Sequence, residues 1–260
     1  MDLSLKGKKA LVCGSSQGIG LAVAQELASL GAQCVLLARN EDRLKAALQT
    51  LAVTDQPHQY AVADFSDPNT VRKAVTPLVQ AGDFHVLINN TGGPAPGPLV
   101  EAPADAFENA FRQHVVINQL LAQLLLPGMI KQKYGRIVNI VSTSVKVPLP
   151  ALGVSNTIRA AVASWAKSLS NEVAVHGITV NNVLPGYTST ARLDQLTAVL
   201  AEKKGISVAE QMNIMAESVP MGRIGTVEEV AAMAAFLCTP AASYVNGVSV
   251  RVDGGRTGSI

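Results

Sequence analysis

Short runs of apolar and mostly β-branched residues alternate along this chain with longer stretches in which apolar residues recur at helical spacing. Runs of the first kind predict buried parallel strands, and the longer stretches predict the helices that connect them. The expected strands are residues 10–13, 34–38, 60–63, 86–88, 136–141, 179–183 and 248–252. The expected helices are residues 18–30, 41–51, 68–80, 104–132, 156–175 and 227–237.

This alternation predicts an α/β fold, a Rossmann-like doubly wound parallel sheet of about seven strands with helices on both faces in three layers. No repeat, linker or low-complexity tract interrupts residues 1–260, so we expect a single domain. Residues 187–221 are rich in Thr, Ser, Ala and Met and have uneven periodicity. They predict a mobile helical lid over a pocket at the carboxyl ends of the strands.

Composition supports a well-packed enzyme-sized domain and argues against several classes of partner. Hydrophobic residues make up 48% of the chain and charged residues 15%, which is enough to bury a large core. The net charge is only +2 with dispersed Lys and Arg, so we expect no nucleic-acid partner. No run approaches the roughly 18 to 20 apolar residues that a membrane helix needs, so we expect no membrane association.

The three cysteines, Cys13, Cys34 and Cys238, are odd in number and lack C-x-x-C spacing. They predict reduced core thiols in a cytoplasmic protein. His58, His85 and His176 show no mutual spacing for a metal, so we expect no metal site.

A glycine-rich run follows the first expected strand and opens the first expected helix. Backbone N–H groups and the positive end of the helix dipole face whatever lies above such a loop, which suits a pyrophosphate. A glycine turn that serves only close packing is the alternative. The predicted cofactor-binding residues of this loop are Gly14, Ser16, Gln17, Gly18, Ile19 and Gly20.

Further motifs follow the loop in a fixed order: Asp64, then Asn89-Asn90-Thr91-Gly92-Gly93, then Pro185-Gly186. Together with the glycine spacing they resemble the short-chain dehydrogenase/reductase family over residues 6–255. The Val252-Asp253-Gly254-Gly255 end also resembles bacterial 3-oxoacyl carrier-protein reductases. The resemblance implies an NAD(P)-dependent oxidoreductase that acts on a small-molecule carbonyl or acyl-thioester substrate, and a homotetramer.

The resemblance also implies contacts to the cofactor. Asp64 would contact the adenine, and Thr190 would hold the nicotinamide carboxamide. The other implied contacts are Asn90, Gly92, Pro185, Gly186 and Thr188.

Charge at the end of the second strand bears on which cofactor is used. An acidic residue there would bind the ribose hydroxyls of NAD and repel a 2′-phosphate, whereas this chain has Arg39. We therefore favour NADP(H). The alternatives are NAD(H) and an Arg39 that is only a solvated loop residue.

In the family, a Ser, a Tyr and a Lys four residues after the Tyr act on the substrate, and an Asn organises water near the Lys. Counting along this chain places Ser142 on the Ser, Ser155 on the Tyr, Arg159 on the Lys and His114 on the Asn. None of the four tyrosines has a Lys four residues later. The resemblance thus implies an atypical active site with Ser142, Ser155, Arg159 and His114 as catalytic candidates.

The substituted residues have different chemistry. An aliphatic hydroxyl such as that of Ser155 is a poor proton donor. Arg159 keeps its charge near neutral pH and suits ribose hydroxyls, a carboxylate or a phosphate. We therefore expect Arg159 to be a cofactor-binding residue that holds the ribose, or to bind the substrate, unless it forms a surface ion pair. His114 titrates near neutrality and is either an acid or a packing residue.

Three functional hypotheses therefore stay open at this stage. One is a divergent NADP(H)-dependent reductase, and another is a catalytically impaired cofactor-binding pseudoenzyme with a sensing or partner role. Non-redox chemistry on an anionic substrate held by Arg159 is a third.

Overall fold

A seven-stranded parallel sheet with strand order β3-β2-β1-β4-β5-β6-β7 forms the centre of the computed structural model, which describes residues 1–259 and leaves Ile260 outside. Its strands are β1 (Lys9–Cys13), β2 (Gln33–Ala38), β3 (Gln59–Val62), β4 (Val86–Asn89), β5 (Gly135–Ile140), β6 (Ile178–Pro185) and β7 (Ser249–Val252). Every neighbouring pair is parallel. The strand order reverses between β1 and β4, where open α/β sheets bind ligands. The expected doubly wound sheet is confirmed.

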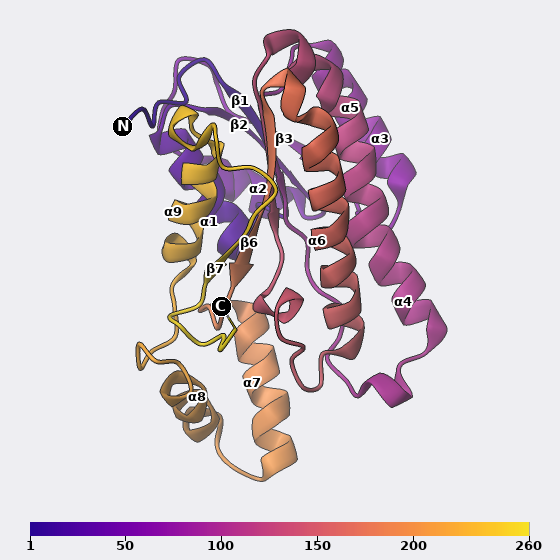
Figure 1. Ribbon diagram of the computed structural model, residues 1–260, viewed down its shortest axis with the longest axis vertical. Coiled ribbons are helices and arrows are strands. Elements are labelled where there is room, and N and C mark those ends of the chain that lie inside the picture. The colour runs from indigo at the N-terminus through magenta and orange to yellow at the C-terminus, as the bar shows by residue number, and fades with distance from the viewer. Residues whose placement is uncertain (260) are drawn as a thin grey trace.

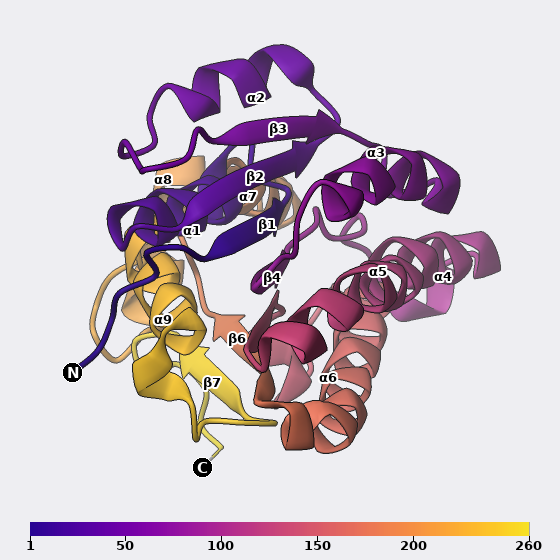
Figure 2. The same ribbon diagram turned by 90° about the horizontal axis from the view of Figure 1, so that it is seen from above.

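Helices cover both faces of the sheet (Figure 2). One layer contains α1 (Gly18–Ser29), α2 (Glu41–Leu48) and α9 (Val227–Cys238), and the other contains α3 (Pro68–Gln80), α5 (Ile117–Gln132) and α6 (Gly153–Val173). Successive side chains of β1 point to opposite faces of the sheet. Ala10 and Val12 pack in the core on one face, and Leu11 and Cys13 pack in the core on the other. The three predicted layers are therefore present.

The expected helix over residues 104–132 is interrupted. The structure has α4 (Ala104–Phe111), then a π-helical turn (Arg112–Val116), then α5. A π turn inserts one extra residue into the helix, and such turns are common at functional sites. The spacing of apolar residues, from which the helix was predicted, did not reveal the one inserted residue. The sequence prediction therefore missed the π turn.

Two further helices lie beyond the carboxyl ends of the strands, at the lower end of the molecule in Figure 1. They are α7 (Ala191–Lys204) and α8 (Val208–Glu217). Each begins at a hydroxyl cap: Thr190 accepts a hydrogen bond from Leu193 N, and Ser207 accepts one from Glu210 N. The segment that the sequence predicted to be helical but irregular thus contains two capped helices.

All three cysteines are buried with free thiols. No helix within residues 1–259 has the length and apolar character to cross a bilayer. Among these residues, no three or more His, Cys, Asp or Glu side chains are grouped so that they could hold a metal ion.

Buried amide side chains cross the sheet in register, from the last residue of β4 to the first residue of β7. Asn89 Nδ2 donates to Asn139 Oδ1 at 2.8 Å, and Asn139 Nδ2 donates to Asn182 Oδ1 at 2.9 Å. Asn182 Nδ2 continues to Ser249 Oγ at 3.1 Å, so the row spans β4 to β7. Buried polar groups require such partners, and this amide row fixes the register of four strands next to the pocket.

We predict that Asn139→Leu, which keeps the side-chain size, destabilises the protein by about 2 to 4 kcal/mol. The reason is that Asn89 Nδ2 and Asn182 Oδ1 would both lose a partner while buried, at about 1 to 3 kcal/mol each. Urea unfolding measures the change in free energy. Asn69→Leu on the exposed side of α3 is the control. A loss for Asn139→Leu no larger than that of the control would contradict the structural role of the row.

Candidate active site

The glycine loop meets the end of β4 at very close range. A Cβ on Gly14 would lie 2.5 Å from the carbonyl oxygen of Asn90, and a Cβ on Gly20 would lie 2.3 Å from the carbonyl oxygen of Gly14. Gly14 and Gly18 also have φ of +58°, a region that favours glycine. Asn90 Nδ2 donates to the Gly14 carbonyl at 3.2 Å, which ties the loop to β4. Only glycine fits these positions.

The first turn of α1 carries no acidic residue, and Gln17 provides no side-chain cap. The N–H groups of this turn therefore remain available to an anion. This loop fits the phosphates of a dinucleotide cofactor.

A pocket of about 530 Å³ opens beside the loop. Its volume lies within the range of small-molecule sites, about 300 to 1,000 Å³. The predicted residues that line it are Gly14, Gln17, Gly18, Ile19, Asn90, Gly92, Ser142, Ser155, Arg159, Pro185, Gly186, Thr188 and Thr190. The predicted residues Ser16, Gly20, Arg39, Asp64 and His114 are not among its lining residues.

Ser142, Ser155 and Arg159 share one wall of the pocket. Ser142 follows β5, and its Oγ accepts a hydrogen bond from Ser144 N at 3.1 Å. Ser155 is 7% exposed and lies one helical turn before Arg159 on α6. The spacing of four residues that the sequence places on one helix face thus brings both side chains to the same cavity.

Arg159 presents a charge without an acidic partner. Its Nη1 donates to the Ile140 carbonyl at 2.8 Å, while its Nε is buried and has no hydrogen-bond partner. Burial, followed by the charge of Arg192, lowers the pKa of Arg159 to about 10, so the group stays protonated at neutral pH. No ion pair within residues 1–259 involves Arg159, which rules out the surface ion pair considered from sequence.

His114 sits on the π turn, behind the pocket wall. Its Nδ1 lies 2.7 Å from Thr91 Oγ1 in a hydrogen bond, and its Nε2 is buried without a partner. Burial first, and then the charges of Arg159 and Arg192, lower the pKa of His114 to about 3. The imidazole is therefore neutral near pH 7, and it reaches the pocket through Thr91, which lines the cavity.

Comparison with known proteins identifies the family. A family model described as enoyl-(acyl carrier protein) reductase matches residues 14–257. The chain is 33% identical over 257 residues to the NADPH-dependent reductase BacG of Bacillus subtilis, covering 97% of this chain and 99% of that protein. It is 33% identical over 259 residues to the 3-oxoacyl-[acyl-carrier-protein] reductase FabG of Aquifex aeolicus, covering 98% and 99%. The chain belongs to the short-chain dehydrogenase/reductase family.

Solved structures of this oxidoreductase family agree with the fold. L-sorbose reductase from Gluconobacter frateurii, complexed with NADPH and L-sorbose, superposes with a TM-score of 0.91 at 31% identity over 100% of both chains. The resemblance proposed from the glycine loop and the later motifs is therefore confirmed for the fold and the family.

Four predicted cofactor residues of this short-chain dehydrogenase/reductase do not line the pocket: Ser16 and Gly20 of the glycine loop, and Arg39 and Asp64. Arg39 is exposed directly after β2, and Asp64 is partly buried after β3. The Ser66 backbone N–H, with a smaller contribution from Arg39, lowers the pKa of Asp64. The two side chains thus stand at the carboxyl ends of adjacent strands, next to the glycine loop.

Sequence reasoning missed two arginines of the site. Arg43 Nη1 donates to Gln17 Oε1 at 2.7 Å, which places a cation from α2 against the glycine loop. Arg192 Nη1 and Nη2 donate to the carbonyls of Gly93 and Pro94 at 3.0 and 2.8 Å. The available signals were spacings: Arg43 lies one helical turn after Arg39, and Arg192 lies two residues after Thr190.

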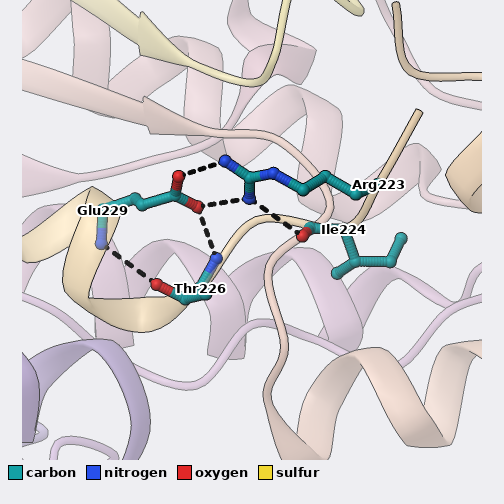
Figure 3. A network of polar contacts seen from close by, with 4 residues as sticks. All are labelled: Arg223, Ile224, Thr226 and Glu229. Carbon is teal, nitrogen blue, oxygen red and sulfur yellow. Dashed lines mark hydrogen bonds and ion pairs between the residues drawn. The ribbon is translucent and has the colours of Figure 1, made fainter. Parts of the chain in front are cut away.

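A polar network holds the segment that follows β6. Arg223 pairs with both carboxylate oxygens of Glu229, which also accepts from Thr226 N at 2.8 Å in a capping box (Figure 3). The network fixes the start of α9. The adjacent Gly225 donates to the Tyr187 carbonyl and accepts from Ser189 N, both at 2.9 Å. These bonds hold residues 187–190 against the pocket.

We predict that His114 makes stability fall with acid. An unfolded histidine has a pKa of about 6.5, so below that pH the unfolded chain binds a proton that folded His114, with a pKa of about 3, does not. Between pH 7 and pH 5 the free energy of unfolding should lose roughly 2 kcal/mol from this group. In His114→Asn that loss should disappear.

Urea unfolding at both pH values measures the effect. His176→Asn, which removes an exposed histidine, should keep the loss seen in the unaltered protein. An unchanged pH dependence in His114→Asn would show that His114 is not held neutral in the fold.

Proposed function

We propose that this chain is an NADP(H)-dependent reductase that transfers hydride between the nicotinamide and the carbonyl of a small substrate, in the manner of 3-oxoacyl-thioester reductases. The observation that carries the proposal is that the glycine loop, Ser142, Ser155 and Arg159 line one cavity. Relatives named as NADPH-dependent or solved with NADPH support the choice of cofactor.

The residues fit distinct parts of the cofactor. The open N–H groups after Gly14, with Ser16 to Gly20, would hold the pyrophosphate. Arg39 and Arg43 would hold the 2′-phosphate as charge-assisted donors, and Asp64 would contact the adenine. Asn90, Gly92, Pro185, Gly186, Thr188 and Thr190 would surround the nicotinamide half. NAD(H) is the alternative cofactor.

Bound NADPH supplies the hydride. Ser142 would donate a hydrogen bond to the substrate carbonyl oxygen, and the nearby charge of Arg159 would stabilise the negative charge that develops there. The proton would come from water or from Ser155, because His114, considered as an acid from the sequence, is neutral near pH 7. Loss of a well-matched general acid costs roughly 10² to 10⁴ in rate, so we expect slow turnover.

The proposal also covers the segment over the pocket, the domain organisation, the oligomeric state and the cellular compartment. Residues 187–221 would act as a lid, because α7 and α8 project beyond the sheet over the pocket side. We propose that the chain is one domain and works as a homotetramer in the cytoplasm, where buried free thiols such as Cys13, Cys34 and Cys238 stay reduced.

One observation favours a second function. Ser155 is an aliphatic hydroxyl and Arg159 stays protonated at neutral pH, so neither reproduces a proton relay. A cofactor-binding pseudoenzyme that senses the nucleotide or pairs with a partner is the second candidate.

We predict that Arg39→Ala raises the Kd for NADPH roughly ten-fold or more and leaves the Kd for NADH unchanged. Only NADPH carries the 2′-phosphate, and a hydrogen bond to a charged group contributes about 1.5 to 3 kcal/mol. Nucleotide fluorescence titration measures both constants. Arg72→Ala on the exposed side of α3 is the control. Binding of neither nucleotide by the unaltered protein would remove the oxidoreductase proposal.

We predict that Ser142→Ala lowers kcat/KM by roughly 10² or more, the size expected for one lost oxyanion donor. NADPH oxidation with a panel of ketones, enones and 3-oxoacyl thioesters provides the assay. Abolition of activity by Ser142→Ala would exclude the pseudoenzyme. An inactive natural protein that gains activity with Ser155→Tyr and Arg159→Lys together would instead support it.

A further inference from the structure

Two arginines from different elements converge beside Gly93. The point that a Cβ on Gly93 would occupy lies 2.9 Å from Arg192 Nη2 and 3.3 Å from Arg159 Nη2. Arg159 comes from α6 and Arg192 from the first turn of α7, and both line the same pocket. A glycine at position 93 leaves room for both guanidinium groups.

The pair carries positive charge that no acidic side chain balances. Within residues 1–259 the pocket lining contains no Asp or Glu, and neither arginine takes part in an ion pair. The two guanidinium groups repel each other because they carry like charges at short distance in a partly buried site. Each guanidinium has also lost part of its hydration shell. The pKa of each guanidinium is lowered by burial, and Arg192 lowers that of Arg159 further. An anion between them would relieve both effects.

The pair has donors to spare. A guanidinium has five N–H groups. Arg159 uses one on the Ile140 carbonyl, and its Nε is buried with no partner. Arg192 uses two on the carbonyls of Gly93 and Pro94, which anchor it in place. The bonds that hold both groups are made to backbone, so the remaining N–H groups are free for a ligand.

We propose that Arg159 and Arg192 form a carboxylate-binding subsite, and that the substrate is a carbonyl compound carrying a free carboxylate. This inference rests on the proposed function for the carbonyl, while the anion site stands on the geometry alone. A carboxylate matches the planar fork of arginine. Leu149, Leu152 and Leu196 line the same cavity and would contact an apolar body of the substrate.

The test uses benzoylformate and its methyl ester, which differ by one charge. Calorimetric titration of the full-length protein measures the Kd of each, without nucleotide and with saturating NADP⁺. We expect benzoylformate to bind at least about ten-fold more tightly than the ester, the equivalent of about 1.4 kcal/mol. In Arg192→Gln the ratio of the two constants should fall to about one, with the ester unaffected.

The controls separate a charge effect from a structural one. Arg192→Lys keeps the charge and should retain part of the preference for the acid, and Arg72→Gln should retain all of it. A matched thermal unfolding midpoint establishes that Arg192→Gln is folded. If Arg192→Gln weakened acid and ester equally, Arg192 would only support the loop, and the subsite would be overturned.

The remaining outcomes are also decisive. Equal affinity for acid and ester in the unaltered protein would overturn the subsite even if NADPH binds and the proposed function holds. Binding of inorganic phosphate but not of benzoylformate would show a phosphate site instead and would overturn the carboxylate assignment. Arg192-dependent binding of benzoylformate in a protein that binds no nucleotide would support the subsite and remove the proposed function.

Discussion

The close approach of the glycine loop to the end of β4 is the constraint on which the site depends. Gly14, Gly20 and Asn90 meet where no Cβ fits, and the Asn90 amide bonds to the loop carbonyl. This contact brings the N-terminus of α1 to the switch between β1 and β4. A cofactor phosphate and the chemistry at the ends of β4 and β5 therefore share one cavity.

The sheet edge and the segment above it are held in different ways. Three buried amides, Asn89, Asn139 and Asn182, continue to Ser249 in one row, and each member depends on its neighbours, which fixes the register of β4 to β7. The segment over the pocket is held by backbone bonds around Gly225 and by exposed ion pairs such as Arg223 with Glu229. Exposed ion pairs contribute little to stability, whereas breaking the amide row would leave buried polar groups without partners.

The sequence predicted the five central strands well, because β1, β2, β4, β5 and β6 are short, mostly apolar runs that are buried almost throughout. It predicted the glycine loop for the same kind of reason, since loop geometry demands glycine. It missed the π turn, because one inserted residue leaves the apolar spacing of residues 104–132 intact. It also missed the contact of Arg192 with Gly93, which joins residues 99 positions apart in the chain. Such a contact depends on how two loops fold together, and local patterns carry no information about it.

The charges and acidities of the side chains in the pocket determine which chemistry they can perform. A Lys beside a Tyr helps catalysis by lowering the pKa of a phenol, whereas Arg159 lies one turn from a Ser that has no comparable acidity. Of these two residues only Arg159 carries a charge at neutral pH. Arg192 adds a second positive charge beside Arg159. Burial first, and then these two charges, lower the pKa of His114, which lies behind Thr91. The pocket lining described over residues 1–259 contains arginines and no Asp or Glu, so positive charge is the feature that a ligand of this site meets.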